Sequence, residues 1–225
     1  MKFRKLDKTV IDQFKKLDTG CISDAMDRIG VPCAFYKIKP ITPGKIMCGQ
    51  AFTVRYVPCG QVKGTVGDFL DDVEPGMVCV LDNGGRDYCT VWGDIMAKYA
   101  VIRGVAGTVI DGVCRDVKAV RGVDYPMFTK DHYFVTGKDR VEVAEINGPV
   151  SISGIKVNPG DVIFGDDSGA LAIPLERAEE VLKIAQDIEE KEAVIFNAIE
   201  NGVSLRDARS RTGYHHLQTK EVKEG

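Results

Sequence analysis

The stretch MVCVLDNGGRDYCTVWGDIMAKYAVIRGVAGTVI, residues 77–110, decides the fold of this chain. Its apolar segment 77–81 predicts a short buried strand, and the apolar segment 107–110 predicts a second one. Between the two, residues 82–91 with their adjacent glycines predict a loop, and residues 93–103 predict a helix. A strand, a helix and a strand in so few residues form a βαβ unit, in which the strands are parallel and the crossover is right-handed.

The sequence on both sides of this unit predicts an α/β protein. Two short helices are expected over 10–17 and 22–29, and the alternating segment AFTVRYV at 51–57 predicts a half-buried strand. A long helix over 175–201 is expected to end at a glycine and to be followed by a short helical segment around Leu205. Short antiparallel or mixed strands are expected after Pro126, at 133–136, 141–146, 151–157, 162–164 and 170–173.

Composition excludes several classes of protein. The net charge is −3 and the 30 Lys and Arg residues are scattered, which argues against nucleic acid as a partner. The seven cysteines form no CxxC pair, which argues against both a disulfide framework and a zinc site. The N-terminal segment is charged and no apolar run approaches the ~18 residues of a membrane span, so we expect a cytoplasmic, soluble protein with no membrane partner.

Three charged residues flank the predicted helix and the strand that follows it. Asp94 stands at the start of the helix, and Arg115 and Asp116 follow the strand, with 20 residues between Asp94 and Arg115. The helix covers about 16 Å at 1.5 Å per residue, and the strand returns about the same distance at 3.3 Å per residue. We therefore expect all three side chains to face one crevice at the carboxyl edge of the strands.

The expected crevice suits a small anion and a hard metal ion. The free N–H groups of 93–96 can hold a carboxylate, and Arg115 can add a bidentate clamp. Asp116, with Asp94 acting directly or through water, offers oxygen ligands, which favours Mg²⁺ or Mn²⁺ over zinc. Two structural alternatives remain open: Asp94 can compensate a helix dipole, and Arg115 and Asp116 can form a surface ion pair.

Four other residues each have two possible roles. Trp92 either walls the pocket or anchors the helix in the core, and the core role is favoured. Arg86, on the predicted loop, either binds a distal carboxylate of a substrate or is solvated. His215 and His216, in a tail expected to be extended, either reach the site of a neighbouring chain or have no role, and the second is favoured.

These motifs resemble those of the RraA-like family, which includes 4-hydroxy-4-methyl-2-oxoglutarate aldolases and regulators of ribonuclease activity. The resemblance covers about 18–200 and implies one RraA-like domain over 1–225, with 203–225 as a C-terminal extension. It is carried by the spacing of Asp94 from Arg115-Asp116, by GVAGTVIDGVCRD at 104–116, by SDAMDRIG at 23–30, and by VNPGDVIFGDDSG at 157–169.

The resemblance implies a fold, an assembly and a site. The fold is a swivelling-domain-like αββα sandwich with a central βαβ unit and mixed sheets, and the assembly is a trimer or a dimer of trimers. The site is that of a class II, Mg²⁺-dependent or Mn²⁺-dependent pyruvate aldolase and oxaloacetate decarboxylase. In that site the matching positions Arg115 and Asp116 bind substrate and metal, and Asp94 contributes to the water shell of the metal. The pyruvoyl unit is held by the amides of Gly93, Asp94, Ile95 and Met96.

We therefore expect a divalent-metal-dependent lyase that cleaves a small 2-oxo acid to pyruvate through a metal-bound enolate. The reaction is a retro-aldol cleavage of the 4-hydroxy-4-methyl-2-oxoglutarate type, a decarboxylation of oxaloacetate, or both. In either case the metal and Arg115 stabilise the charge of the enolate, whereas no lysine stands in an apolar strand to form a Schiff base. The C-terminal glutamate that serves the family's aldolases from a neighbouring subunit has no match here, so the acid/base group is not assigned.

The alternative function is that of a non-catalytic regulator that binds and inhibits an endoribonuclease. Such a regulator needs a protein-binding surface and no metal. The sequence has Asp94, Arg115 and Asp116 together, and a protein that only binds another has no chemical need for these three residues. The enzyme is therefore the favoured hypothesis.

Overall fold

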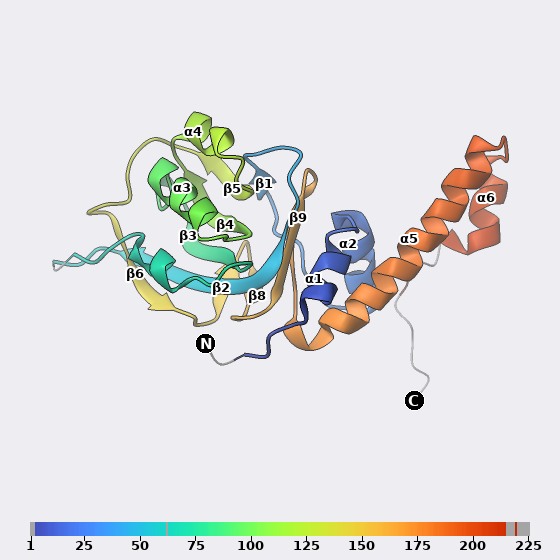
Figure 1. Cartoon of the computed structure of the whole chain (residues 1–225), viewed down its shortest axis with the longest axis horizontal. Helices are drawn as coiled ribbons and strands as arrows, with labels where there is room; N and C mark the ends of the chain where they lie inside the picture. The colour runs from blue at the N-terminus through green and yellow to red at the C-terminus, as the bar shows by residue number, and fades with distance from the viewer. Residues whose placement is uncertain (1–2, 62, 215–218, 220–225) are drawn as a thin grey trace.

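The computed structural model describes residues 3–61, 63–214 and 219 and shows an α/β chain (Figure 1). The α-helices are α1 (Lys8–Phe14), α2 (Thr19–Arg28), α3 (Asp94–Ile102), α4 (Val117–Gly122), α5 (Ala178–Glu200) and α6 (Leu205–Thr212), with short 3₁₀ helices at Asp68–Asp72 and Leu175–Arg177. The strands are β1 (Lys39–Pro40), β2 (Met47–Pro58), β3 (Val78–Thr90), β4 (Gly107–Cys114), β5 (Met127–His132), β6 (Val141–Ile146), β7 (Val150–Ile152), β8 (Ile155–Val157), β9 (Val162–Asp166) and β10 (Gly169–Ile173).

A mixed sheet forms the centre of the molecule. Its strand order is β1-β5-β4-β3-β2-β9-β10, with β6 paired to β2 in addition. The pairs β2–β3, β3–β4 and β4–β5 are parallel, and the other pairs are antiparallel. The first half of β2 pairs with β9 and its second half with β3. The long strand β2 thus connects two parts of the sheet that lie in different layers.

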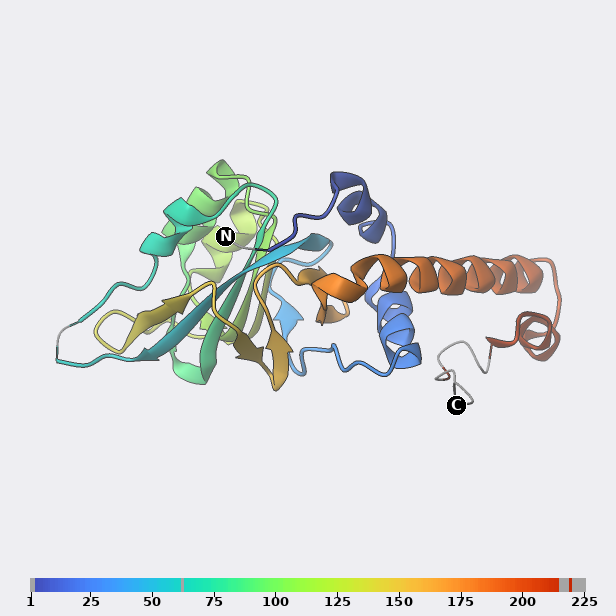
Figure 2. The same ribbon diagram turned by 90° about the horizontal axis from the view of Figure 1, so that it is seen from below.

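Three buried apolar clusters separate four layers of structure. One cluster lies between the parallel strands and the helices α3 and α4, and includes Phe52, Leu81 and Ile110. A second lies between the parallel strands and the layer formed by β7 to β10, around Phe128. The third lies between β9, β10 and the helices α1, α2 and α5, around Phe164. Figures 1 and 2 show the two helical layers on opposite sides of the strands, which confirms the predicted αββα sandwich.

The central βαβ unit is confirmed, with one correction. The strands β3 and β4 are parallel and α3 connects them. The predicted loop at 82–91 is wrong, because β3 continues to Thr90. Its register against β4 shifts twice there, and Gly84 and Gly85 adopt left-handed backbone angles (φ 60° and 70°). The two glycines therefore mark an irregular part of a strand and not its end.

Five strands are expected after Pro126, whereas the structure has six, β5 to β10. Their pairing is mixed, as expected: β5 is parallel to β4, and the other pairs are antiparallel. The strand expected at 133–136 is wrong, because β5 ends at His132. The single strand expected at 151–157 is a hairpin, β7 and β8, which turns at Ser153 and Gly154 with φ values of 49° and 86°. Helix α4 was not predicted: it has only six residues, too few for an apolar period to be visible in the sequence.

The long C-terminal helix is confirmed, as is the short helical segment after it. Helix α5 packs on α2 with its first half, and its second half extends away from the strands to meet α6 (Figure 2). Phe196 and Val194 in that second half are exposed, 61% and 58% respectively. In the described part of the chain, no helix has the length and apolar character needed to cross a membrane.

Candidate active site

The βαβ unit brings the three predicted residues together. The backbone N–H of Asp94, the first residue of α3, donates to Asp116 Oδ2 at 3.3 Å. Arg115 Nε lies 3.2 Å from the same oxygen. The proximity expected from the 20-residue spacing is therefore present, although the chemical roles of these residues stay predictions.

The backbone on either side of Asp116 directs its carboxylate toward α3. The N–H of Arg115 donates to the carbonyl oxygen of Trp92 at 3.0 Å, which ties the end of β4 to the residues that precede α3. Asp116 itself has a left-handed backbone (φ 58°), which Asp tolerates better than most residues. It occupies the position before α4, yet its side chain makes no capping hydrogen bond there.

Gly93 allows the close approach of these groups. Its backbone is extended (φ −148°), a conformation open to any residue. A Cβ atom at this position, however, would lie 2.7 Å from Asp116 Oδ2 and 3.1 Å from Arg115 Nε. The site therefore requires glycine at 93 for space and not for backbone conformation.

We predict that Gly93→Ala lowers kcat/KM about 100-fold, because the added methyl group displaces Asp116 and Arg115 by a few tenths of an ångström or more. The melting temperature should change by only a few degrees, since the backbone angles suit alanine. Steady-state pyruvate release and thermal unfolding measure the two effects. Gly122→Ala is the matched control, because nothing lies within 4 Å of a Cβ there. Full activity of Gly93→Ala would contradict this geometry.

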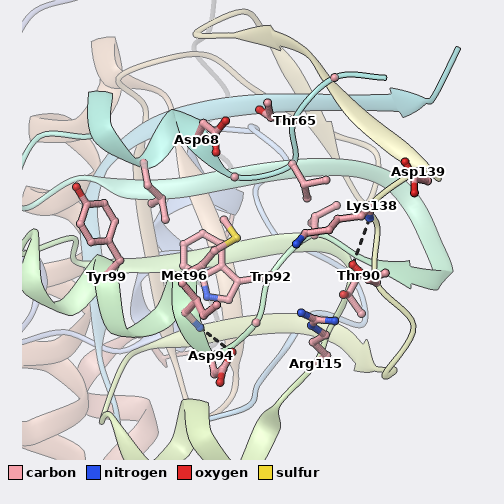
Figure 3. Close-up of a pocket in the computed structure, with 18 of the residues that line it drawn as sticks. Thr65, Asp68, Thr90, Trp92, Asp94, Met96, Tyr99, Arg115, Lys138 and Asp139 are labelled. Atoms are coloured by element: carbon pink, nitrogen blue, oxygen red, sulfur yellow. Dashed lines mark hydrogen bonds between the residues drawn. The ribbon is translucent and has the colours of Figure 1, made fainter. Parts of the chain in front are cut away.

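A cavity of about 640 Å³ opens beside this cluster (Figure 3). One wall is the start of α3 with Arg115, and a second wall is the segment 64–71. The third wall comes from the end of β3 and the loop that follows β5, and includes Thr90, Thr136 and Lys138. Its volume lies within the range of small-molecule sites.

Trp92 fulfils both of its predicted roles. It lines the cavity, and it is also 1% exposed, with its ring stacked on Tyr125 at a centroid distance of 6.0 Å. Its indole Nε1 has no hydrogen-bond partner among the described residues. Burial holds the ring in place, so Trp92 forms an apolar part of the cavity wall next to α3.

Several cavity residues were not anticipated from the sequence, among them Lys138, Asp68 and Tyr99. Lys138 points its ammonium group into the cavity, while Asp68 and Tyr99 lie on other parts of the wall (Figure 3). Arg86, the candidate for a distal carboxylate, is not among the lining residues and donates instead to the carbonyl oxygen of Asn83 at 2.7 Å. A lysine in a polar loop gives no sequence signal that separates it from a solvated one.

Two titratable neighbours of the site, Cys114 and Tyr99, are not activated as nucleophiles. Burial raises the pKa of the Cys114 thiol to about 11, so it stays protonated near neutral pH. The hydroxyl of Tyr99 donates to Asp71 Oδ1 at 2.6 Å, and this hydrogen bond raises the pKa of Tyr99. The histidines His215 and His216 lie outside the described residues. The functional groups that the described site offers to a ligand are therefore carboxylates, backbone amides and cations.

Asp94 and Asp116 are the carboxylates of the site that could hold a hard divalent ion. Asp94 Oδ1 accepts from the N–H of Ile95 at 2.8 Å, and Asp116 Oδ2 is engaged by Arg115 and the amide of Asp94. The second oxygen of each carboxylate accepts no hydrogen bond from the described residues. No group of three His, Cys, Asp or Glu that could hold a metal occurs in those residues. Mg²⁺ is commonly held by one or two carboxylates, with water and substrate oxygens as its other ligands.

Comparison with known proteins gives relatives of one family. "Protein DlpA" of Legionella pneumophila is 38% identical over 204 residues, which are 89% of this chain but only 33% of DlpA, so the chain spans about a third of that protein. "Putative 4-hydroxy-4-methyl-2-oxoglutarate aldolase" of Halalkalibacterium halodurans is 32% identical over 193 residues, 86% of this chain and 90% of the relative.

A solved structure and a family model are also similar to this chain. The crystal structure of an uncharacterized protein from Pseudomonas syringae pv. tomato has a TM-score of 0.89 at 36% identity, and covers 94% of this chain and 97% of that one. The family model described as "RraA-like: Aldolase/RraA" matches residues 19–172, more than half of the sequence. The resemblance seen in the motifs is thereby confirmed, and the chain belongs to the RraA-like family.

Proposed function

We propose that this chain is a divalent-metal-dependent lyase that cleaves a small 2-oxo acid to pyruvate. The observation that carries the proposal is the start of α3 and Arg115 at the wall of a cavity, with Asp116 in contact with both behind that wall. A carboxylate, a fixed cation and the N–H groups of a helix N-terminus lie in one place, which matches the needs of an anionic substrate. In this structure the N–H groups of Asp94 and Ile95 donate to the carboxylates of Asp116 and Asp94. The name of the relative from Halalkalibacterium halodurans agrees with an aldolase reaction.

Each residue has a defined task in this reaction. The amides of Gly93, Asp94, Ile95 and Met96 bind the substrate carboxylate, and Arg115 places its guanidinium where negative charge grows on the keto oxygen. Asp116 would be the residue that holds the ion, and Asp94 would act on water bound to it. Mg²⁺ or Mn²⁺, when bound, supplies a Lewis acid for the oxygens of the 2-oxo acid.

Both candidate reactions require the same arrangement. In retro-aldol cleavage of 4-hydroxy-4-methyl-2-oxoglutarate, the C3–C4 bond breaks, the C4 hydroxyl loses its proton, and the electron pair stays on C3. In decarboxylation of oxaloacetate, the bond from C3 to the leaving carboxylate breaks instead. The pair on C3 is delocalised as an enolate beside Arg115 before C3 is protonated, so one site can serve both reactions.

The direct test is pyruvate release from a panel of 2-oxo acids by the purified chain. We expect turnover of 4-hydroxy-4-methyl-2-oxoglutarate, oxaloacetate or both with Mg²⁺, and loss of turnover with EDTA that excess Mg²⁺ restores. Turnover that persists after complete chelation would exclude the metal-dependent route. Absence of pyruvate from every member of the panel would exclude the lyase.

The competing hypothesis is a non-catalytic regulator that binds an endoribonuclease. A regulator of that kind does not depend on the cavity, so Arg115→Ala should leave its binding unchanged while it removes lyase activity. Titration of a purified endoribonuclease with both forms of the chain, alongside the pyruvate assay, separates the two functions. The grouped residues Asp94, Arg115 and Asp116 favour the lyase.

We further propose that the chain forms a homo-oligomer, a trimer or a dimer of trimers, in which a neighbour completes the site. The second half of α5 extends beyond the layer that its first half covers. It exposes Phe196 and Val194, and α6 exposes Leu205, whereas Ile195 is buried. Apolar groups on such an extension commonly pack against a symmetry mate.

Light scattering coupled to size exclusion at low micromolar concentration checks this assembly. We expect a mass of three or six chains of 24.6 kDa, with activity across the peak. Phe196→Glu should shift the mass toward one chain and lower activity at least about tenfold, because a charge replaces the aromatic side chain that we propose to pack on the neighbouring chain. Lys183→Gln, on the exposed face of the first half of α5, is the control. A fully active wild-type monomer would contradict the shared site.

A further inference from the structure

Lys138 is a cation of the cavity that the proposed reaction does not use. Its side chain enters from the loop between β5 and β6, and its ammonium group points toward the side of the cavity where Trp92 and Arg115 lie (Figure 3). Lys138 is itself exposed to solvent. Its direction into a cavity that already holds a candidate anion-binding wall indicates a second place for an anion.

The backbone that carries Lys138 is fixed against β3. The N–H of Thr90 donates to the carbonyl oxygen of Val135 at 3.0 Å, and the N–H of Lys138 donates to Thr136 Oγ1 at 3.2 Å. Gly137 packs so closely that a Cβ atom there would lie 2.3 Å from the carbonyl oxygen of Thr90. The origin of the lysine side chain is therefore set by packing, which is what a specific binding contact requires.

The charge of Lys138 is not neutralised by the protein. In residues 3–61, 63–214 and 219, no carboxylate lies within ion-pairing distance of its ammonium group. The adjacent Asp139 is engaged by Lys63, with 2.8 Å between Nζ and Oδ1, and this hydrogen bond lowers the pKa of Asp139. Arg115, by contrast, already faces Asp116. Lys138 is thus available to an anionic group of a ligand.

We propose that Lys138 binds the second carboxylate of a 2-oxo dicarboxylic acid and thereby favours aldol cleavage over decarboxylation at this site. The inference rests on the proposed function, because it places the first carboxylate and the keto group against α3 and Arg115. The rest of the substrate then extends into the cavity, where a charge-assisted hydrogen bond from Lys138 meets its distal carboxylate.

The two reactions treat the distal carboxylate differently. In the retro-aldol reaction the C4 hydroxyl proton is lost and C3 gains a proton, while the C5 carboxylate, attached to C4, keeps its charge and leaves within the second pyruvate. In decarboxylation the distal carboxylate itself becomes neutral CO₂ and leaves its bonding electrons on C3. A cation on that group stabilises the ground state of decarboxylation more than its transition state, and so slows it.

The test measures both reactions with Mg²⁺ in the full chain and in Lys138→Met. We expect kcat/KM for retro-aldol cleavage to fall about 10- to 100-fold, mainly through KM, as a hydrogen bond to a charged group is lost. We expect kcat for oxaloacetate decarboxylation to stay equal or rise, so the ratio of the two activities falls at least about tenfold. Lys138→Arg should restore most of the ratio. Lys98→Met, on the exposed face of α3 outside the cavity, is the matched control for charge.

A binding measurement separates recognition from turnover. Trp92 is the only tryptophan of the sequence and lines the same cavity, so its fluorescence reports ligand binding. We titrate 2-oxoglutarate, which has a distal carboxylate but undergoes neither reaction, and 2-oxopentanoate, which lacks that carboxylate. Lys138→Met should raise the Kd of 2-oxoglutarate at least about tenfold and leave that of 2-oxopentanoate unchanged.

Three results would overturn the inference. An active protein whose activity ratio and 2-oxoglutarate Kd do not change in Lys138→Met would remove the role of Lys138 and leave the proposed function standing. Borohydride trapping of pyruvate on Lys138 would make this residue a Schiff-base nucleophile and not a carboxylate-binding group. A wild-type chain inactive toward both substrates would remove the proposed function, and this inference with it.

Discussion

Asp116→Asn is expected to lower kcat/KM for pyruvate release at least about 1000-fold, because it removes the carboxylate that we propose as the direct ligand of the metal. Asn keeps the shape of the side chain and, like Asp, tolerates the left-handed backbone at this position (φ 58°). The loss should therefore appear in Mg²⁺ binding by calorimetry and in turnover, and not in the fold.

The stability of the variant is the internal check. The side chain of Asp116 makes no capping hydrogen bond to α4, so its replacement should change the free energy of unfolding by less than about 1 kcal/mol. Asp124→Asn is the matched control, because Asp124 also has a left-handed backbone (φ 58°) and pairs with Lys45 away from the cavity. Wild-type Mg²⁺ affinity and turnover in Asp116→Asn would end the metal-site proposal.

The geometry of the three-residue cluster could be predicted from sequence because it depends on one local unit. The helix and the returning strand have regular rises, so the chain between Asp94 and Arg115 comes back to its starting edge. The distances of 3.3 Å from the amide of Asp94 and 3.2 Å from Arg115 Nε to Asp116 Oδ2 agree with that estimate. The requirement for Gly93 was not foreseen, because it arises from side chains 22 and 23 residues later in the chain.

The third wall of the cavity could not be predicted, because it depends on contacts between distant segments. The adjacent glycines Gly84 and Gly85 are typical of a turn, but β4 continues to pair with the chain beyond them. The loop with Lys138 then docks on the end of this extended strand through Thr90 and Val135. The periodicity of apolar residues in a sequence does not predict a hydrogen bond between residues 45 positions apart. The sequence therefore gave no reason to place Lys138 in the cavity.

The alternating pattern of β2 also did not predict that both faces of this strand are buried. Phe52 and Val54 were expected on one buried face, with Thr53 on an exposed one. The structure buries Thr53 completely, and its hydroxyl donates to the carbonyl oxygen of Gly148 at 2.6 Å. Because β2 passes between layers, both of its faces are covered over much of its length, and a buried hydroxyl with a partner costs little.

Arg115→Lys tests whether the guanidinium group acts on the transition state or only holds the substrate. Lysine keeps the positive charge but loses the planar fork, so it cannot face both Asp116 and a substrate oxygen in the same fixed geometry. We expect kcat to fall about 100-fold or more at saturating substrate, with a smaller change in KM, because the enolate gains charge that the keto acid lacks. Steady-state kinetics with excess Mg²⁺ measures both constants.

The control for this substitution is Arg55→Lys. The Arg55 side chain also meets a carboxylate through Nε and Nη2, that of Glu145 at 3.3 and 3.2 Å, but it lies outside the cavity. The substitution Arg55→Lys should leave both kcat and KM unchanged, since exposed ion pairs contribute little to stability. A variant Arg115→Lys with normal kcat and only a raised KM would show that Arg115 binds substrate and transition state equally. The charge on the enolate would then fall to the metal and the α3 amides alone, and Arg115 would lose its place in the catalytic step.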